Sequence, residues 1–217
     1  MIRTVFTLIL SVFFVSFSAR AGGAGRPSAD EANQVLAKYR KSEAFQARVK
    51  KTVRNEILGS ESISTGDFYF SKGKLRMELT EPENVTLVYD GKTIWVETRL
   101  DESTIEVTKI RSKELKKNDS ILAVLFDKKD ILKSFNMIDS KMSDHTKSFS
   151  FEPKKGSKTE LKFLGLATKD KELQKIEYKD DRENHVSLEF EDVKRGKIVA
   201  SKFRYMPPAG ASITDIK

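Results

Sequence analysis

Polar and apolar residues alternate with a period of two along most of the chain, which is typical of half-buried β-strands. The alternation is cleanest in Ser148–Phe151 and in Val186–Phe190. Asp90-Gly91, between two apolar and β-branched runs, favours a two-residue hairpin turn, and similar short turns separate most of the other segments. The pattern predicts one antiparallel meander, with strands from Phe45 onward and at Ser62–Ser71, Leu75–Leu79, Val85–Tyr89, Thr93–Thr98, Lys147–Glu152, Thr159–Leu166, Leu173–Lys179, His185–Glu191 and Lys197–Tyr205.

Two stretches have helical spacing instead. The first runs to about Lys41, with Ser28 or Asp30 as its N-cap and a single apolar face made of Ala32, Val35, Leu36 and Tyr39. The second runs from about Ser120 to Phe135 and has a wide apolar face, made of Ile121, Leu122, Leu125, Phe126, Ile131, Leu132 and Phe135.

A sheet with this many strands curls under its own twist, so the two helices are expected to cover its concave side. The pattern is compatible both with a filled core and with a cavity lined by the same side chains.

The first 21 residues have the three parts of a secretory signal peptide. Arg3 is followed by 13 mainly apolar residues, Val5–Phe17, and then by Ala19-Arg20-Ala21, an A-x-A cleavage site. A membrane-spanning helix needs roughly 20 residues, so an uncleaved anchor is the less favoured interpretation. We therefore expect export to the periplasm, a flexible linker over residues 22–28, and a single soluble domain over residues 29–217.

Composition narrows the possible chemistry. The chain has no cysteine, which excludes disulfides, thiol catalysis and thiolate metal sites. His145 and His185 are the only histidines, and no hydrolase, zinc-protease or nucleotide-binding motif occurs. We predict neither enzymatic activity nor a cofactor or metal.

The net charge is positive, with 40 Lys and Arg residues against 32 Asp and Glu residues. The basic runs have acids close by and lack the interleaved aromatic residues that nucleic-acid binding needs. The excess charge indicates either solvated surfaces or attraction to an acidic partner or an anionic membrane surface.

Three segments resemble the family of outer-membrane lipoprotein carrier proteins, LolA. Gly66–Leu79 reads GDFYFSKGKLRMEL and, after Pro82, Leu87–Trp95 reads LVYDGKTIW; this is similar to the family's basic turn, strand, proline and L-V-x-D-G-K-T-L/I-W hairpin. Phe203–Ala211, FRYMPPAGA, is similar to the family's F-x-F-x-P-P-x-G ending. The amphipathic helix after the signal peptide matches as well.

The resemblance implies an unclosed antiparallel β-barrel of about ten or eleven strands, with an α-helical lid over a hydrophobic cavity. It implies a monomeric carrier that receives acylated lipoproteins from an inner-membrane ABC transporter and passes them to an outer-membrane receptor. The candidate acyl-binding residues are Phe68, Phe70, Leu75, Met77, Leu87, Trp95, Leu122, Leu125, Phe126, Leu132, Phe149 and Phe151.

A basic side chain, often Arg followed by proline, usually latches the lid in this family. Here Lys72 stands at that turn without the proline, and Arg76 follows four residues later. Our hypothesis is that Lys72 or Arg76 supplies the lid contacts.

Several alternatives stay open. Each candidate cavity residue is also a normal occupant of a core. The outer-membrane acceptor that shares the fold is anchored by a lipidated cysteine, which this chain lacks. A periplasmic sensor domain that binds lipid or lipoprotein, and an interaction protein with a filled core, are the other two interpretations.

Overall fold

The structure is a computed structural model that describes residues 26–40, 44–80, 82–111, 131–157, 159, 161–180 and 183–216. The expected signal peptide and most of the second expected helix lie outside the described residues. The helical elements are α1 (Ala29–Arg40) and two 3-10 turns, η1 (Ile131–Lys133) and η2 (Ala200–Phe203). The strands are β1 (Phe45–Asn55), β2 (Ser60–Ser71), β3 (Lys74–Leu79), β4 (Val85–Tyr89), β5 (Thr93–Arg99), β6 (Ile105–Arg111), β7 (Phe135–Ser143), β8 (Thr146–Pro153), β9 (Phe163–Lys169), β10 (Glu172–Lys179), β11 (Asn184–Arg195) and β12 (Ser212–Ile216).

The strands form one sheet in the order β12-β6-β5-β4-β3-β2-β1-β11-β10-β9-β8-β7. It consists of two antiparallel meanders, β1–β6 and β7–β11, which the pairing of β1 with β11 joins in the middle. β12 is added at one edge, parallel to β6. Within the described residues β7 and β12 are the two edges of the sheet, so the barrel is unclosed, as the resemblance implied.

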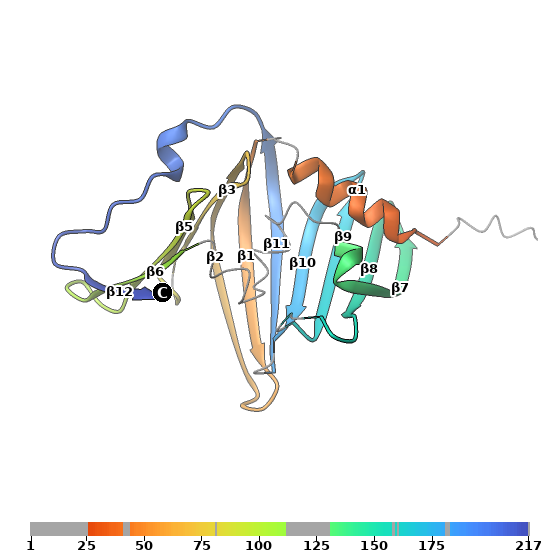
Figure 1. The fold of residues 1–217 in the computed structure, drawn as a ribbon, viewed down its shortest axis with the longest axis horizontal. Coiled ribbons are helices and arrows are strands. Elements are labelled where there is room, and N and C mark those ends of the chain that lie inside the picture. Colours follow the sequence, from red (N-terminus) through yellow and green to blue (C-terminus); the bar gives the residue numbers. More distant parts are fainter. Residues whose placement is uncertain are drawn as a thin grey trace, which may run out of the picture.

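The sheet has an inner face, which carries the main cluster of buried apolar side chains, and an outer face. Strand register assigns residues to these faces, because directly opposite residues of an antiparallel pair lie on the same side. Phe68 pairs with Met77, which pairs with Leu87, so these three share the inner face. α1 crosses β8, β9 and β10 on this side (Figure 1).

A capping box begins α1. The Glu31 amide donates to the Ser28 hydroxyl at 3.2 Å, and the Ser28 amide donates to the Glu31 carboxylate at 3.4 Å. Of the two N-caps considered, Ser28 is therefore the one used, and the reciprocal pair satisfies two backbone donors that have no partner within the helix.

The predicted strand Thr159–Leu166 is displaced to β9 (Phe163–Lys169), and β6, β7 and β12 have no counterpart among the predicted strands. Two further segments differ in the kind of structure they form. Phe135, expected at the end of the second helix, begins β7, and among the described residues of that stretch Ile131–Lys133 forms a single 3-10 turn. The expected strand at Lys197–Tyr205 leaves the sheet after β11 and contains η2. Two of its side chains pack on the outer face instead: the Lys202 ammonium lies 4.1 Å from the Tyr69 ring centroid, and the Tyr205 ring lies 5.4 Å from that of Trp95.

Candidate functional site

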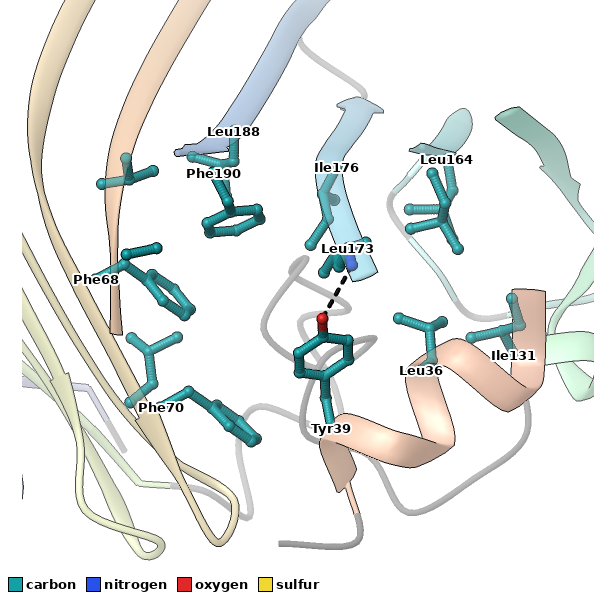
Figure 2. Close-up of a cluster of buried hydrophobic side chains, with 14 of the residues drawn as sticks. Leu36, Tyr39, Phe68, Phe70, Ile131, Leu164, Leu173, Ile176, Leu188 and Phe190 are labelled. Atoms are coloured by element: carbon teal, nitrogen blue, oxygen red, sulfur yellow. Dashed lines mark hydrogen bonds between the residues drawn. The ribbon is translucent and has the colours of Figure 1, made fainter. Parts of the chain in front are cut away.

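The inner face carries a continuous apolar surface that extends across both meanders. Figure 2 shows Phe68 and Phe70 of β2, Leu188 and Phe190 of β11, and Ile176 of β10 facing the same interior as Leu36 and Tyr39 of α1. The side chain of Phe68 stacks edge-on against that of Phe190, with ring centroids 5.0 Å apart. Helix α1 therefore covers part of an apolar concavity formed by two halves of one sheet.

Eight of the twelve predicted acyl-binding residues lie together on this surface. Six are buried in the cluster, and Leu87 and Leu132 are partly buried against it; the six are Phe68, Phe70, Leu75, Met77, Phe149 and Phe151. Leu122, Leu125 and Phe126 lie outside the described residues, and their role stays a prediction.

Trp95 is not brought together with these residues. Val88 pairs with Trp95, whereas Leu87 pairs with Val96, so Trp95 lies on the outer face of β5. There its ring packs against Tyr205, and the Lys109 ammonium lies 5.3 Å from its centroid. Trp95 therefore anchors the segment after β11 to the outer face and does not line the apolar concavity.

The two residues expected to latch the lid lie away from α1's buried face. Arg76 pairs with Tyr69 and Val88, which places it on the outer face, and its guanidinium contacts the Glu78 carboxylate at 2.6 Å. Lys72 is exposed in the turn between β2 and β3, where its φ of 51° lies in the left-handed region. The structure therefore places Arg76 on the face opposite α1; a contact of Lys72 or Arg76 with the second expected helix would involve residues outside the described ones and stays a prediction.

A different group of side chains holds the C-terminal end of α1. The Tyr39 hydroxyl donates to the Glu172 carboxylate at 2.8 Å. It also accepts from the Leu173 amide at 2.9 Å (Figure 2). The same carboxylate binds the Lys38 ammonium at 2.6 Å and contacts the Arg195 guanidinium. We call Lys38, Tyr39, Glu172 and Arg195 the helix clamp.

One sequence signal pointed to the clamp. Tyr39 closes the apolar face of α1, and a buried tyrosine needs a partner for its hydroxyl. Its partners come from β10 and β11, more than 130 residues along the chain, which no local pattern indicates.

The N-terminal half of α1 is tied down separately. The Glu31 carboxylate contacts the Lys147 ammonium of β8, and this contact holds the pKa of Glu31 below its usual range. The helix is thus fixed by charged contacts at both ends and by apolar contacts between them.

Alkaline pH should weaken the helix clamp. Burial, reinforced by the Glu172 carboxylate, raises the pKa of Tyr39 from 10.0 to about 12. Because the pKa of Tyr39 is higher in the folded protein than in the unfolded chain, its protonated hydroxyl stabilises the fold fully at pH values below the unfolded pKa. This contribution to stability is lost as the pH rises through the folded pKa. Between pH 8 and pH 11.5 the contribution of Tyr39 should fall by about 2 kcal/mol.

Urea unfolding of the wild-type protein and of Tyr39→Phe at both pH values measures this effect. The phenylalanine variant should be less stable at pH 8, and the difference should shrink or reverse at pH 11.5. The wild type and the variant share every other titratable group. If their unfolding free energies differed by the same amount at both pH values, Tyr39 would not titrate as described.

The family model described as outer membrane lipoprotein carrier protein LolA matches residues 40–206. The chain belongs to this family. The match runs from the end of α1 to the segment after η2, so it includes both meanders and the residues of the inner face that lie on them.

Relatives support the assignment over nearly the full length of this LolA-family chain. An outer-membrane lipoprotein carrier protein of Ralstonia nicotianae is 25% identical over 94% of this chain and 95% of its own length. One of Klebsiella pneumoniae is 22% identical over 86% of this chain and 89% of its own length. An uncharacterized conserved protein of Thermus thermophilus, 14% identical, has the same fold with a TM-score of 0.52, covering 88% of this chain and 100% of its own.

Two further findings concern the part of the chain that the structure describes. No helix there is long and apolar enough to cross a membrane. No group of three or more His, Asp or Glu side chains there has the arrangement needed to hold a metal ion.

Proposed function

We propose that this chain carries acylated lipoproteins by shielding their acyl chains against the inner face of the sheet. The supporting observation is the apolar surface that continues across β2, β3, β8, β9, β10 and β11 and that α1 covers in part. Its proposed lining is the set of residues described above: Phe68, Phe70, Leu75, Met77, Leu87, Leu132, Phe149 and Phe151.

Acyl chains need such a surface in water, because each buried methylene group gains about 0.8 kcal/mol. In the structure α1 occupies part of the concavity, and Ala32, Leu36 and Tyr39 are buried there. Acyl chains would replace these helix contacts when α1 moves away, so the same apolar surface would be covered in the empty and the loaded protein.

Membership of the family supports a more detailed proposal, which names the compartment, the donor and the acceptor. We propose that the carrier works in the periplasm as a monomer, receives lipoproteins from an inner-membrane ABC transporter, and passes them to an outer-membrane receptor. For the second step the carrier must hold acyl chains less tightly than the receptor does. A helix that leaves its site at moderate free-energy cost provides such limited affinity.

Native mass spectrometry of the protein, purified from cells that also produce one lipoprotein, tests the proposal. We expect a one-to-one complex with the acylated lipoprotein and none with a variant of the lipoprotein whose acylated cysteine is replaced by serine. A carrier that appears alone in both preparations, or that binds both forms equally, would contradict acyl-dependent carriage.

A further inference from the structure

A groove of about 820 Å³ lies at the rim of the sheet, where the β2–β3 turn, the residue before β1 and the segment after β11 meet. Ser71 and Lys74 form a pair next to Phe70 and Leu75, so they face outward while Phe70 and Leu75 face inward. Ser71 and Lys74 therefore place much of the groove on the outer side of the sheet, while Arg195 of the helix clamp lies where the groove meets the inner side, and none of the proposed acyl-binding residues lines it. Its volume falls within the range of small-molecule sites, roughly 300–1,000 Å³.

One wall of this rim groove is apolar. Phe203 of η2 is buried beside it, and Ile198, Val199, Ala200 and Ala44 supply the remaining aliphatic surface. Val199 is 65% exposed. A bound alkyl chain would cover this exposed aliphatic surface.

Cationic side chains also line the rim groove. Lys72, Lys74 and Lys197 line it, and none of the three forms an ion pair with another described residue. None of the described lining residues is an aspartate or glutamate. The neighbouring Lys202 contrasts with them, since its ammonium is already held between Glu78, at 3.7 Å, and the Tyr69 ring.

Three uncompensated ammonium groups around one opening make a local positive potential, which favours an anionic group there. Arg195 also lines the groove, but its guanidinium is held by Glu172 of the helix clamp. An apolar wall beside a cationic rim is complementary to a molecule with an alkyl chain and a negatively charged head.

We propose that the rim groove binds a single anionic amphiphile, with its carboxylate or phosphate head between Lys72, Lys74 and Lys197 and its alkyl chain along Ile198, Val199 and Phe203. A free fatty acid and a lysophospholipid share this chemistry. The site is distinct from the proposed acyl-carrying surface and does not depend on it.

Isothermal titration of the full-length mature protein with decanoate, below its micellar concentration, tests the proposal. Decanoate should bind at least tenfold more tightly than decanol, which lacks the charge, and than inorganic phosphate, which lacks the chain. Added 0.5 M salt should weaken binding, because the charges are near the surface. A lysophosphatidylglycerol of the same chain length, titrated in parallel, shows which of the two heads is preferred.

The triple variant Lys72→Gln, Lys74→Gln, Lys197→Gln should bind decanoate at least tenfold more weakly. The matched control removes three exposed lysines from the other half of the molecule, Lys133→Gln, Lys154→Gln, Lys155→Gln, and should bind normally. Lys197→Glu alone, at an exposed position, gives the same test if the triple variant folds poorly.

The variant Leu87→Gln distinguishes decanoate binding in the rim groove from decanoate binding at the inner face. Decanoate binding that survives Leu87→Gln and falls with the lysine variants supports the groove. Binding that falls only with Leu87→Gln, equal binding of decanol, or binding only to phosphatidylglycerol vesicles and not to monomeric decanoate would overturn the proposal. None of these measurements uses a lipoprotein, so a failure here leaves the test of carriage unaffected.

Discussion

Gly66→Ala is expected to destabilise the protein more than any other single substitution considered for the sheet. A β-carbon at Gly66 would lie 1.8 Å from the Glu78 carbonyl oxygen and 2.8 Å from its carbonyl carbon. Both are backbone atoms of β3, so no side-chain rotation can relieve the overlap. The two strands must separate at the point where Gly66 pairs with Leu79, and Leu79 is part of the buried cluster.

The loss should exceed about 3 kcal/mol, at the high end for an overpacked site, because backbone pairing and burial are both affected. For a domain of this size that corresponds to a fall of Tm on the order of 10 °C. Thermal unfolding followed by circular dichroism measures it directly.

Gly165→Ala is the matched control, since Gly165 is also inside a strand. There the nearest atoms to an added β-carbon belong to the side chains of Phe163 and Glu177, at 3.1 and 3.2 Å, and these can rotate. We expect a Tm within a few degrees of the wild type for Gly165→Ala. A Gly66→Ala protein that melts as late as the control would show that β2 and β3 can shift apart without loss of packing.

Local pattern was sufficient to predict most of the sheet. Strands β2 to β5 and β8, β10 and β11 lie close to the predicted segments, because each has apolar side chains on one face and turn residues at its ends. The capping box at Ser28 and Glu31 likewise depends only on neighbours in sequence. The alternation of polar and apolar residues does not predict the unclosed barrel or the family. Both were predicted from the family resemblance, which includes the motif around the Asp90-Gly91 turn.

The face of Trp95 could not be predicted in the same way. Ile94, Trp95 and Val96 form a continuous apolar run, so the period of two does not show which of them faces inward. The partner that fixes Trp95 on the outer face, Tyr205, is 110 positions away. Arg76 is different, since Leu75 and Met77 on either side of it are apolar and already indicate that it faces outward.

The helix clamp could not be predicted without the tertiary structure, and it bears on the proposal that α1 is a cover that moves. Glu172 accepts bonds from Lys38, Tyr39 and Arg195, while its side chain is still 28% exposed. Partial exposure lowers the strength of such contacts because solvent screens them. In the proposed carriage mechanism, contacts of this limited strength would define one position for α1 and still allow α1 to leave it.

Glu172→Ala should release α1 while the sheet stays folded. The substitution leaves the buried Tyr39 hydroxyl without its acceptor and leaves Lys38 and Arg195 without their shared carboxylate. We expect a loss of about 1–3 kcal/mol, most of it in the docking of the helix and little in the sheet. Amide hydrogen exchange should accelerate about tenfold or more in α1 and at Leu173, whose amide bonds to Tyr39, but not in β1 or β2.

Glu189→Ala provides the matched control, because Glu189 is a glutamate on the adjacent strand that contacts Lys50 at 3.9 Å and Lys175 at 3.4 Å on the outer face. Its removal should leave exchange in α1 unchanged. If the chain carries lipoproteins as proposed, Glu172→Ala should also pass a bound lipoprotein to an acceptor about tenfold more slowly, since α1 then competes less well with the acyl chains for the apolar surface. Exchange that rises equally in both variants, or in the whole sheet with Glu172→Ala, would mean that the clamp stabilises the fold in general and does not control the cover.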